Sequence, residues 1–341
     1  MDTLTRALSS LRQGCYDEAA QFCHEILENE PANDRVLHVL GVVAIQQGRL
    51  NDAQEFFQQA AGISPSDARH HLNLANVLRA RGDIEKASAA YRIAAESQPD
   101  TPAAWAGWAY ATMPGDHYRD LLHSFHDWLQ PGVYLEIGIE SGRTLSLARP
   151  PTKAIGVDPK PDLQYTFQAS TQIFELTSDE FFSAHEVRQQ FGAVDLAFLD
   201  GLHLFEQTLR DFLNIEQQAN RNGVILIHDC LPLHPLVAQR DPQTEFWTGD
   251  TWKVIPILKQ YRPDLEVFTI ASAPTGLGVV TCLDPESTVL GKLWNEILDA
   301  WLDQQLPEDK KTRDGLLAAV KNDFDEVRGR IEMALGRARK P

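Results

Sequence analysis

Along the first hundred residues, small and turn-forming positions recur at a fixed spacing of 34 residues, with apolar and polar stretches between them. The recurring positions are Gly14, Gly48 and Gly82, then Ala19, Ala53 and Ala87, then Pro31, Pro65 and Pro99. We expect the alanines to let two helices approach closely, each glycine to end a helix in a left-handed conformation, and each proline to close the next helix. The spacing predicts three helix pairs within residues 1–112, with a partial unit or cap helix starting at residue 101.

The pattern changes after residue 130, where short apolar runs replace the repeat. Runs of this length are typical of strands buried in a parallel sheet. The predicted strands cover residues 133–137, 154–157, 194–199 and 223–228, with residues 266–270 and 278–281 as a closing antiparallel hairpin. Residues 143–149 predict a short helix, and residues 204–219 predict an amphipathic one. We therefore predict an α/β domain over residues 113–286.

Residues 287–341 predict C-terminal helices. Apolar residues with a spacing of three or four are Leu317, Val320, Phe324, Val327, Ile331 and Leu335. One amphipathic helix packed on its neighbour is the simplest interpretation, and a short coiled-coil homodimer is the alternative. The basic residues 337–340 predict a solvated tail. The predicted fold class is α plus α/β, a helical solenoid followed by a Rossmann-like, mostly parallel sheet with one antiparallel strand.

The net charge of −17 argues against a nucleic-acid partner, because phosphate binding needs a positive field. It disfavours anionic membrane surfaces for the same reason, and no apolar run approaches the roughly 18 residues of a membrane span. The four cysteines form no CxxC pair, and the first residues lack the pattern of a signal peptide. These features predict a cytoplasmic location with reduced thiols.

A glycine loop, Gly138-x-x-x-Gly142, follows the first predicted strand of the α/β domain. Glu136 precedes the loop, and Asp158 ends the second strand 22 residues after Glu136. Glycine lets a ligand approach bare backbone, and an acid at this strand end can accept hydrogen bonds from ribose hydroxyls. Glu136 and Glu140 are unfavourable for a diphosphate, but they suit a cationic ligand such as S-adenosylmethionine, which carries a sulfonium and an ammonium group.

These motifs, within residues 130–285, resemble the class I S-adenosylmethionine-dependent methyltransferases. The endings Asp200-Gly-Leu-His203 and His228-Asp229 resemble a subgroup of sugar O-methyltransferases and cephalosporin hydroxylase-like proteins. The first part of the chain resembles the tetratricopeptide repeat, whose period is 34 residues.

The methyltransferase resemblance implies a set of cofactor-binding residues. Gly138 and Gly142 would line the methionine part of the cofactor, with Glu136 beneath it, and Asp158 would hold the ribose. Asp179 would contact the adenine, with Ser178 as the alternative residue for that role.

Asp200, His203, His228 and Asp229 all fall at carboxyl ends of predicted strands, the edge where open α/β sheets bind ligands. The resemblance implies that Asp200, His228 and Asp229 hold a divalent cation. Magnesium prefers oxygen ligands, so the imidazole also allows manganese, iron or zinc, or no metal.

Asp200, His203 and His228 are the catalytic candidates. Either histidine can be the general base that takes the proton of a substrate hydroxyl. The alternative is that His203 caps a helix and His228 packs in the core. Trp247 and Trp252 are expected either to wall the acceptor pocket or to lie in the core.

Together these features predict a methyltransferase that acts on the hydroxyl of a sugar or other small molecule. Stacked helix pairs present a surface that commonly holds peptides, so the array is expected to recruit a protein or carrier, or to mediate self-association. The alternatives are a protein methyltransferase whose target peptide binds the array, and an interaction scaffold without catalysis.

Overall fold

A computed structural model describes residues 2–338 of the chain. Contacts divide the chain into two compact units. The first unit comprises residues 1–112 together with the short segment 244–246, and the second comprises residues 113–243 and 247–341. The end of the predicted basic tail, residues 339–340, lies outside the described residues.

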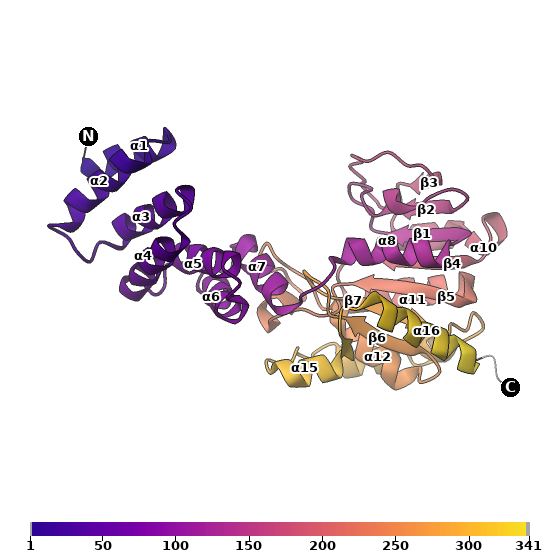
Figure 1. Ribbon diagram of the computed structural model, residues 1–341. Coiled ribbons are helices and arrows are strands. Elements are labelled where there is room, and N and C mark those ends of the chain that lie inside the picture. The colour runs from indigo at the N-terminus through magenta and orange to yellow at the C-terminus, as the bar shows by residue number, and fades with distance from the viewer. Residues whose placement is uncertain (1, 339–341) are drawn as a thin grey trace. The chain divides into compact units, whose positions relative to one another are not determined.

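The first unit is built from consecutive helices that pack in pairs (Figure 1). They are α1 Thr3–Arg12, α2 Tyr16–Leu27, α3 Asp34–Gln46, α4 Leu50–Ile63, α5 Ala68–Ala80, α6 Ile84–Ser97 and α7 Pro102–Thr112. Gly14, Gly48 and Gly82 lie just beyond the first helix of each pair, with φ of +78°, +73° and +84°. Ala19, Ala53 and Ala87 are fully buried between helices. The helical repeat predicted from the 34-residue spacing is therefore confirmed.

The second unit contains one eight-stranded sheet in the order β3-β2-β1-β4-β5-β7-β6-β8. The strands are β1 Val133–Ile137, β2 Lys153–Val157, β3 Ser170–Phe174, β4 Val194–Leu199, β5 Ala219–His228, β6 Glu266–Ile270, β7 Leu277–Thr281 and β8 Ala319–Val320. β1 to β5 pair in parallel, and β7 runs antiparallel to both β5 and β6. The predicted fold class is confirmed. In this topology the carboxyl ends of β1, β2 and β4 meet at one edge, where such sheets bind ligands.

The second unit also contains helices, several of which pack on the sheet. They are α8 Tyr118–Leu129, α9 Ser178–Ala184, α10 Val187–Gln190, α11 Phe205–Gln218, α12 Val254–Tyr261, α13 Val289–Lys292, α14 Trp294–Trp301, α15 Lys310–Leu316 and α16 Phe324–Ala338. Phe125 of α8 and Ile331 of α16 share one buried apolar cluster with Tyr134 and Phe198 of the sheet. Figure 1 shows α8 and α16 lying across the sheet. The sequence reading had not identified α8, whose apolar face includes Leu121 and Phe125.

Two local predictions were wrong. Residues 143–149 form only one turn of 3₁₀ helix, Leu145–Leu147. Residues 317–335 do not form one helix, because residues 318–320 run beside β6 and accept hydrogen bonds from the backbone of Thr269 and Ala271. An unpaired sheet edge needs partners for its N–H groups, and this need outweighs the helical spacing. The helix begins only at Phe324, and Val327 and Ile331 are buried against the sheet.

No helix among residues 2–338 combines the length and the apolar character that a membrane crossing requires.

Candidate functional site

A cavity of about 500 Å³ opens at the carboxyl ends of β1, β2 and β4. Its apolar wall includes Ile137, Val157, Pro159 and Leu202, and its polar wall includes Thr177, Ser178, Asp179, Gln207 and Asp211. Four residues that the sequence proposed for the site also line it: Gly138, Asp158, Asp179 and Asp200. Such a mixture of apolar and polar groups is typical of small-molecule sites.

Gly138 and Asp158 form one side of the cavity. A Cβ atom on Gly138 would lie 2.1 Å from the carbonyl oxygen of Asp200, so the first loop packs directly against the exit of β4. Asp158 Oδ2 accepts the backbone N–H groups of Ile139 and Glu140 at 3.0 and 2.9 Å, and its Oδ1 accepts that of Lys160 at 2.8 Å. Each carboxylate oxygen can accept more than one hydrogen bond. Asp158 thus shapes the glycine loop and can still accept hydroxyl groups of a ligand.

Glu136 and Gly142 do not line this cavity. Glu136 is fully buried, and its carboxyl group accepts hydrogen bonds from Tyr134 Oη at 2.6 Å and from Thr144 Oγ1. Burial raises the pKa of Glu136 to about 8. The side chain therefore lies beneath the loop and is protonated at neutral pH, instead of meeting a ligand directly. Gly142 has φ of +76° and lies beside Phe167 and Leu163.

The opposite wall of the cavity comes from α9 and α11. Gln207 Nε2 lies 3.1 Å from each of three acceptors, Ser178 Oγ, Asp179 Oδ1 and Asp211 Oδ1, which share its two N–H groups. Burial raises the pKa of Asp211 to about 6. Ser178 and Asp179 therefore both face the cavity, and the geometry does not choose between them. Gln207 and Asp211 were not predicted from the sequence. Asp211 could have been, because it is an acid on the buried face of the amphipathic helix α11.

Asp200, His203, His228 and Asp229 come together as one cluster, which adjoins the cavity through Asp200. His203 Nε2 lies 3.5 Å from Asp200 Oδ1 and 3.3 Å from Asp229 Oδ2. His228 Nδ1 lies 3.2 Å from Asp200 Oδ1 and 3.4 Å from Asp229 Oδ1. His203 and Asp229 have φ of +21° and +60°, backbone conformations that residues other than glycine rarely adopt. Strained residues of this kind concentrate at functional sites.

The cluster has alternating charges. Burial lowers the pKa of His203, but Asp229 and Asp200 outweigh it and raise that pKa to about 8. Burial also lowers the pKa of His228, but Asp200 and Asp229 outweigh it and raise that pKa well above its ordinary value. Burial raises the pKa of Asp200, while His228 and His203 more than offset this and hold it well below its usual range. Both imidazoles are therefore mainly protonated at neutral pH when no metal is bound.

The donor set fits a divalent cation. One ligand atom each from Asp200, His203 and Asp229 lies within 4.8 Å of the others. Ligand atoms bound at about 2.1 Å from one metal are about 3.0 to 3.4 Å apart, close to the His203 distances above. Two carboxylates and one imidazole suit manganese, iron or zinc better than magnesium. The sequence reading placed His228 in the metal set, whereas this triad contains His203 and leaves His228 in contact with both carboxylates.

Aromatic residues frame the cluster. Tyr118, the first residue of α8, has its ring 4.2 Å from the His228 ring, and Thr275 Oγ1 lies 3.4 Å from His228 Nε2. Trp247 lies against His203, with ring centroids 5.3 Å apart. Trp252 is almost fully buried, so it is a core residue and does not wall a pocket. Tyr118 and Thr275 were missed because neither belongs to a motif.

Comparison with protein families agrees with the two kinds of structure. Residues 135–230 match a family described as a methyltransferase domain. Residues 10–69 and 44–107 match the tetratricopeptide repeat. Each family covers less than half of the chain. No curated protein matches the chain.

Several solved structures with such repeats are similar to part of the chain. A crystal structure of MamA shares 17% identity with a TM-score of 0.31, over 32% of this chain and 64% of that one, so the match spans less than two thirds of MamA. The first repeat domain of Spaghetti (RPAP3), bound to an HSP90 peptide, shares 16% identity over 32% and 87%, with a TM-score of 0.31. The Sgt2 repeat domain from Aspergillus fumigatus shares 18% identity over 32% and 74%, with a TM-score of 0.31.

Proposed function

We propose that the protein is an S-adenosylmethionine-dependent methyltransferase that acts on a hydroxyl group of a sugar or other small molecule. The observation that carries this proposal is the cavity lined by Gly138 and Asp158, at the sheet edge of a region that matches a methyltransferase domain. The family match supports methyl transfer. The acceptor class rests on the resemblance of the Asp200–His203 and His228–Asp229 endings to sugar O-methyltransferases.

The cavity suits the groups of this cofactor, which supplies an electrophilic methyl group when bound. Asp158 has acceptor capacity for the ribose hydroxyls, and Asp179 or Ser178 can accept from the adenine amino group. Gly138 presents bare backbone to the methionine part, and the negative charge of Glu140 on the cavity wall favours a cationic ligand.

The chemistry of the acceptor would take place beside Asp200. If a divalent cation is used, Asp200, His203 and Asp229 would hold it. The bound cation would lower the pKa of the acceptor hydroxyl. Binding at His203 Nε2 would release the proton that this nitrogen carries. His228 would then orient the two carboxylates through its Nδ1 contacts. Without a metal, a histidine must lose its proton before it can serve as the general base.

The repeat array would recruit a carrier or partner protein, and the chain would be organised as repeats over residues 1–112, a methyltransferase domain over 113–286 and C-terminal helices over 287–341. We also propose a cytoplasmic location. The alternatives remain a protein methyltransferase with its target held by the array, and a scaffold without catalysis.

Calorimetry with S-adenosylmethionine tests the proposal, with and without EDTA and with added magnesium or manganese. We expect the natural protein to bind and Asp158→Ala to weaken binding roughly 100-fold, because charged hydrogen bonds contribute about 1.5–3 kcal/mol each. Asp195→Ala is the matched control, since Asp195 Oδ2 also accepts two successive backbone N–H groups, those of Gly132 and Val133, at the other edge of the sheet. No binding by the natural protein, or equal losses in both variants, would contradict the assignment.

A further inference from the structure

Asp250 holds the backbone on both sides of Leu204. Its backbone N–H donates to the carbonyl oxygen of His203 at 3.1 Å, and its Oδ1 accepts the N–H of Phe205 at 2.9 Å. Phe205 begins α11, whose N-cap residue Leu204 provides no side-chain hydrogen bond. Asp250, which lies 45 residues further along the chain, supplies the acceptor that this helix start lacks.

Gly249 brings this segment close to His203. A Cβ atom on Gly249 would lie 1.8 Å from the carbonyl oxygen of His203, and the φ of Gly249 is +59°. His203 itself has a φ of +21°. A residue remains in such a conformation only when its surroundings impose it. Gly249 and Asp250 provide that constraint from one side, and Trp247 of the same segment packs against the imidazole ring.

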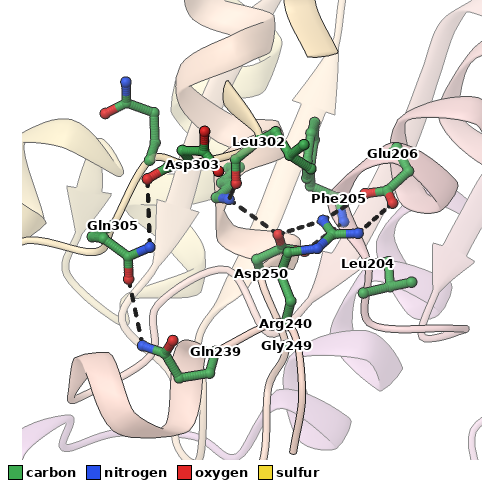
Figure 2. Close-up of polar contacts among 12 residues, drawn as sticks. Leu204, Phe205, Glu206, Gln239, Arg240, Gly249, Asp250, Leu302, Asp303 and Gln305 are labelled. Atoms are coloured by element: carbon green, nitrogen blue, oxygen red, sulfur yellow. Dashed lines mark hydrogen bonds and ion pairs between the residues drawn. The ribbon is translucent and has the colours of Figure 1, made fainter. Parts of the chain in front are cut away.

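A network of charges holds the Asp250 carboxylate in place. Its Oδ2 pairs with Arg240 Nη1 at 2.8 Å and with Lys253 Nζ at 3.1 Å. Figure 2 shows Arg240 between the carboxylates of Asp250 and Glu206. Lys253 Nζ also donates to the carbonyl oxygen of Leu302 at 2.8 Å. Asp250 is itself buried, and the two cations and two anions of this network balance in charge.

We infer that Asp250 is a positioning residue for His203. By fixing the backbone of residues 203–205, it sets the direction in which the imidazole meets Asp200 and Asp229. The catalytic meaning of that direction rests on the proposed function, whereas the positioning itself does not. Without the Asp250 carboxylate, the N–H of Phe205 would lose its acceptor and the backbone of residues 203–205 would be held less firmly. The imidazole of His203 would then shift relative to Asp200 and Asp229.

The test separates this role from that of an ordinary buried ion pair. Glu216 provides the matched control, because it lies on α11, the helix whose first residue Asp250 binds. Glu216 pairs with Arg262 at 2.7 Å and accepts the backbone N–H of Asp284 at 3.0 Å. We would compare Asp250→Asn, Asp250→Ala and Glu216→Gln in the full chain. Asp250→Asn keeps an oxygen for the N–H of Phe205 but loses the charge, whereas Asp250→Ala loses both.

Two readouts decide the outcome without any need for activity. Amide hydrogen exchange at Phe205 should accelerate at least about tenfold in Asp250→Ala, with a smaller increase in Asp250→Asn. The ring signal of His203 in a carbon–proton NMR spectrum, assigned with His203→Gln, should shift in both Asp250 variants. Glu216→Gln should lower the unfolding temperature and change neither readout.

Unchanged exchange and an unchanged His203 signal in Asp250→Ala would overturn the inference, as would equal changes in Glu216→Gln. Calorimetry on the same variants separates this result from the proposed function. The Asp250 variants should still bind S-adenosylmethionine, because Gly138 and Asp158 lie outside the segment that Asp250 holds. Failure of the natural protein to bind would reject the proposed function and leave the two readouts to decide on Asp250.

Discussion

The two units each contain a histidine between two aspartates whose ligand atoms lie within 4.8 Å of one another. In the first unit the residues are Asp34, Asp67 and His70, and in the second they are Asp200, His203 and Asp229. The two clusters contain the same residue types with their ligand atoms within the same distance, so any difference in what they can bind must come from their surroundings.

In the array, the cluster is a closed set of internal contacts. His70 Nδ1 lies 2.9 Å from His38 Nδ1, and His70 Nε2 lies 3.0 Å from Asp34 Oδ2, so both ring nitrogens have partners. Asp67 pairs with Arg69 at 2.5 Å. Asp34 begins α3 and Asp67 caps α5, positions where the helix dipole favours negative charge and disfavours a metal cation.

In the second unit, the cluster reaches a cavity through Asp200. His203 Nδ1 is buried and has no hydrogen-bond partner within the described part of the chain. Asp200 faces the 500 Å³ cavity. A set of residues therefore becomes a candidate site when its partners leave it incomplete, and it becomes a structural joint when they complete it.

The largest expected difference between the clusters is in metal binding. Asp200→Asn should weaken manganese binding by more than about 100-fold, because it removes a charged ligand. His70→Ala should leave manganese binding unchanged and lower the unfolding temperature, because it removes a buried side chain and the hydrogen bonds that this side chain makes with His38 and Asp34. Manganese titrations followed by electron paramagnetic resonance measure the affinity. Equal losses in both variants, or no binding by the natural protein, would contradict the metal assignment.

Substitution of a glycine with positive φ by alanine should cost more stability in the second unit than in the first. Gly138→Ala should destabilise the second unit by about 3 kcal/mol, since the new Cβ would meet the backbone oxygen of Asp200 at 2.1 Å. Gly48→Ala meets no atom within 4 Å and should cost only about 1 kcal/mol, the strain of a left-handed alanine. Urea unfolding measures both losses. Equal costs would show that steric contact at Gly138 does not constrain the loop.

The two units should also differ in the pH dependence of their stability. A hydrogen bond from His70 lowers the pKa of Asp34, so its stabilisation exists above the ordinary aspartate range and is lost as the pH falls. Asp34→Asn should therefore be less stable than the natural protein at pH 7, with a difference that shrinks below about pH 4. Measurement of unfolding between about pH 2 and pH 7 tests this, and a constant difference over that range would contradict it.

Asp211 should show the opposite trend. Burial raises its pKa to about 6, so the natural protein loses stability as the pH rises from about 4 to 6. Asp211→Asn should remove that loss and be more stable at pH 7 by about 2–3 kcal/mol. If Asp211→Asn is instead less stable than the natural protein at pH 7, the ionised carboxylate of Asp211 has sufficient hydrogen-bond partners in the folded protein.

The sequence was most informative where structure depends on neighbours in the chain. The repeat, the strand positions and the glycine loop are local, because helix ends and buried strands are set by a few adjacent residues. The placement of Gly138, Asp158 and Asp200 around one cavity also followed, since parallel strands bring their carboxyl ends to one edge. The prediction of one helix over 317–335 was wrong, because the sequence of residues 318–320 does not reveal that β6 has an open edge with which they pair.

By itself, the sequence determined the two kinds of structure and the residue types at the strand ends. Only the tertiary structure decided that Glu136 is buried beneath the loop, that His203 joins the two aspartates, and that Asp250 holds the backbone beside it. These facts depend on contacts between residues far apart in the chain, such as Asp250 and Phe205. Local preferences carry no record of such contacts, since burial, charge balance and backbone strain are fixed only when the sheet and its loops pack together.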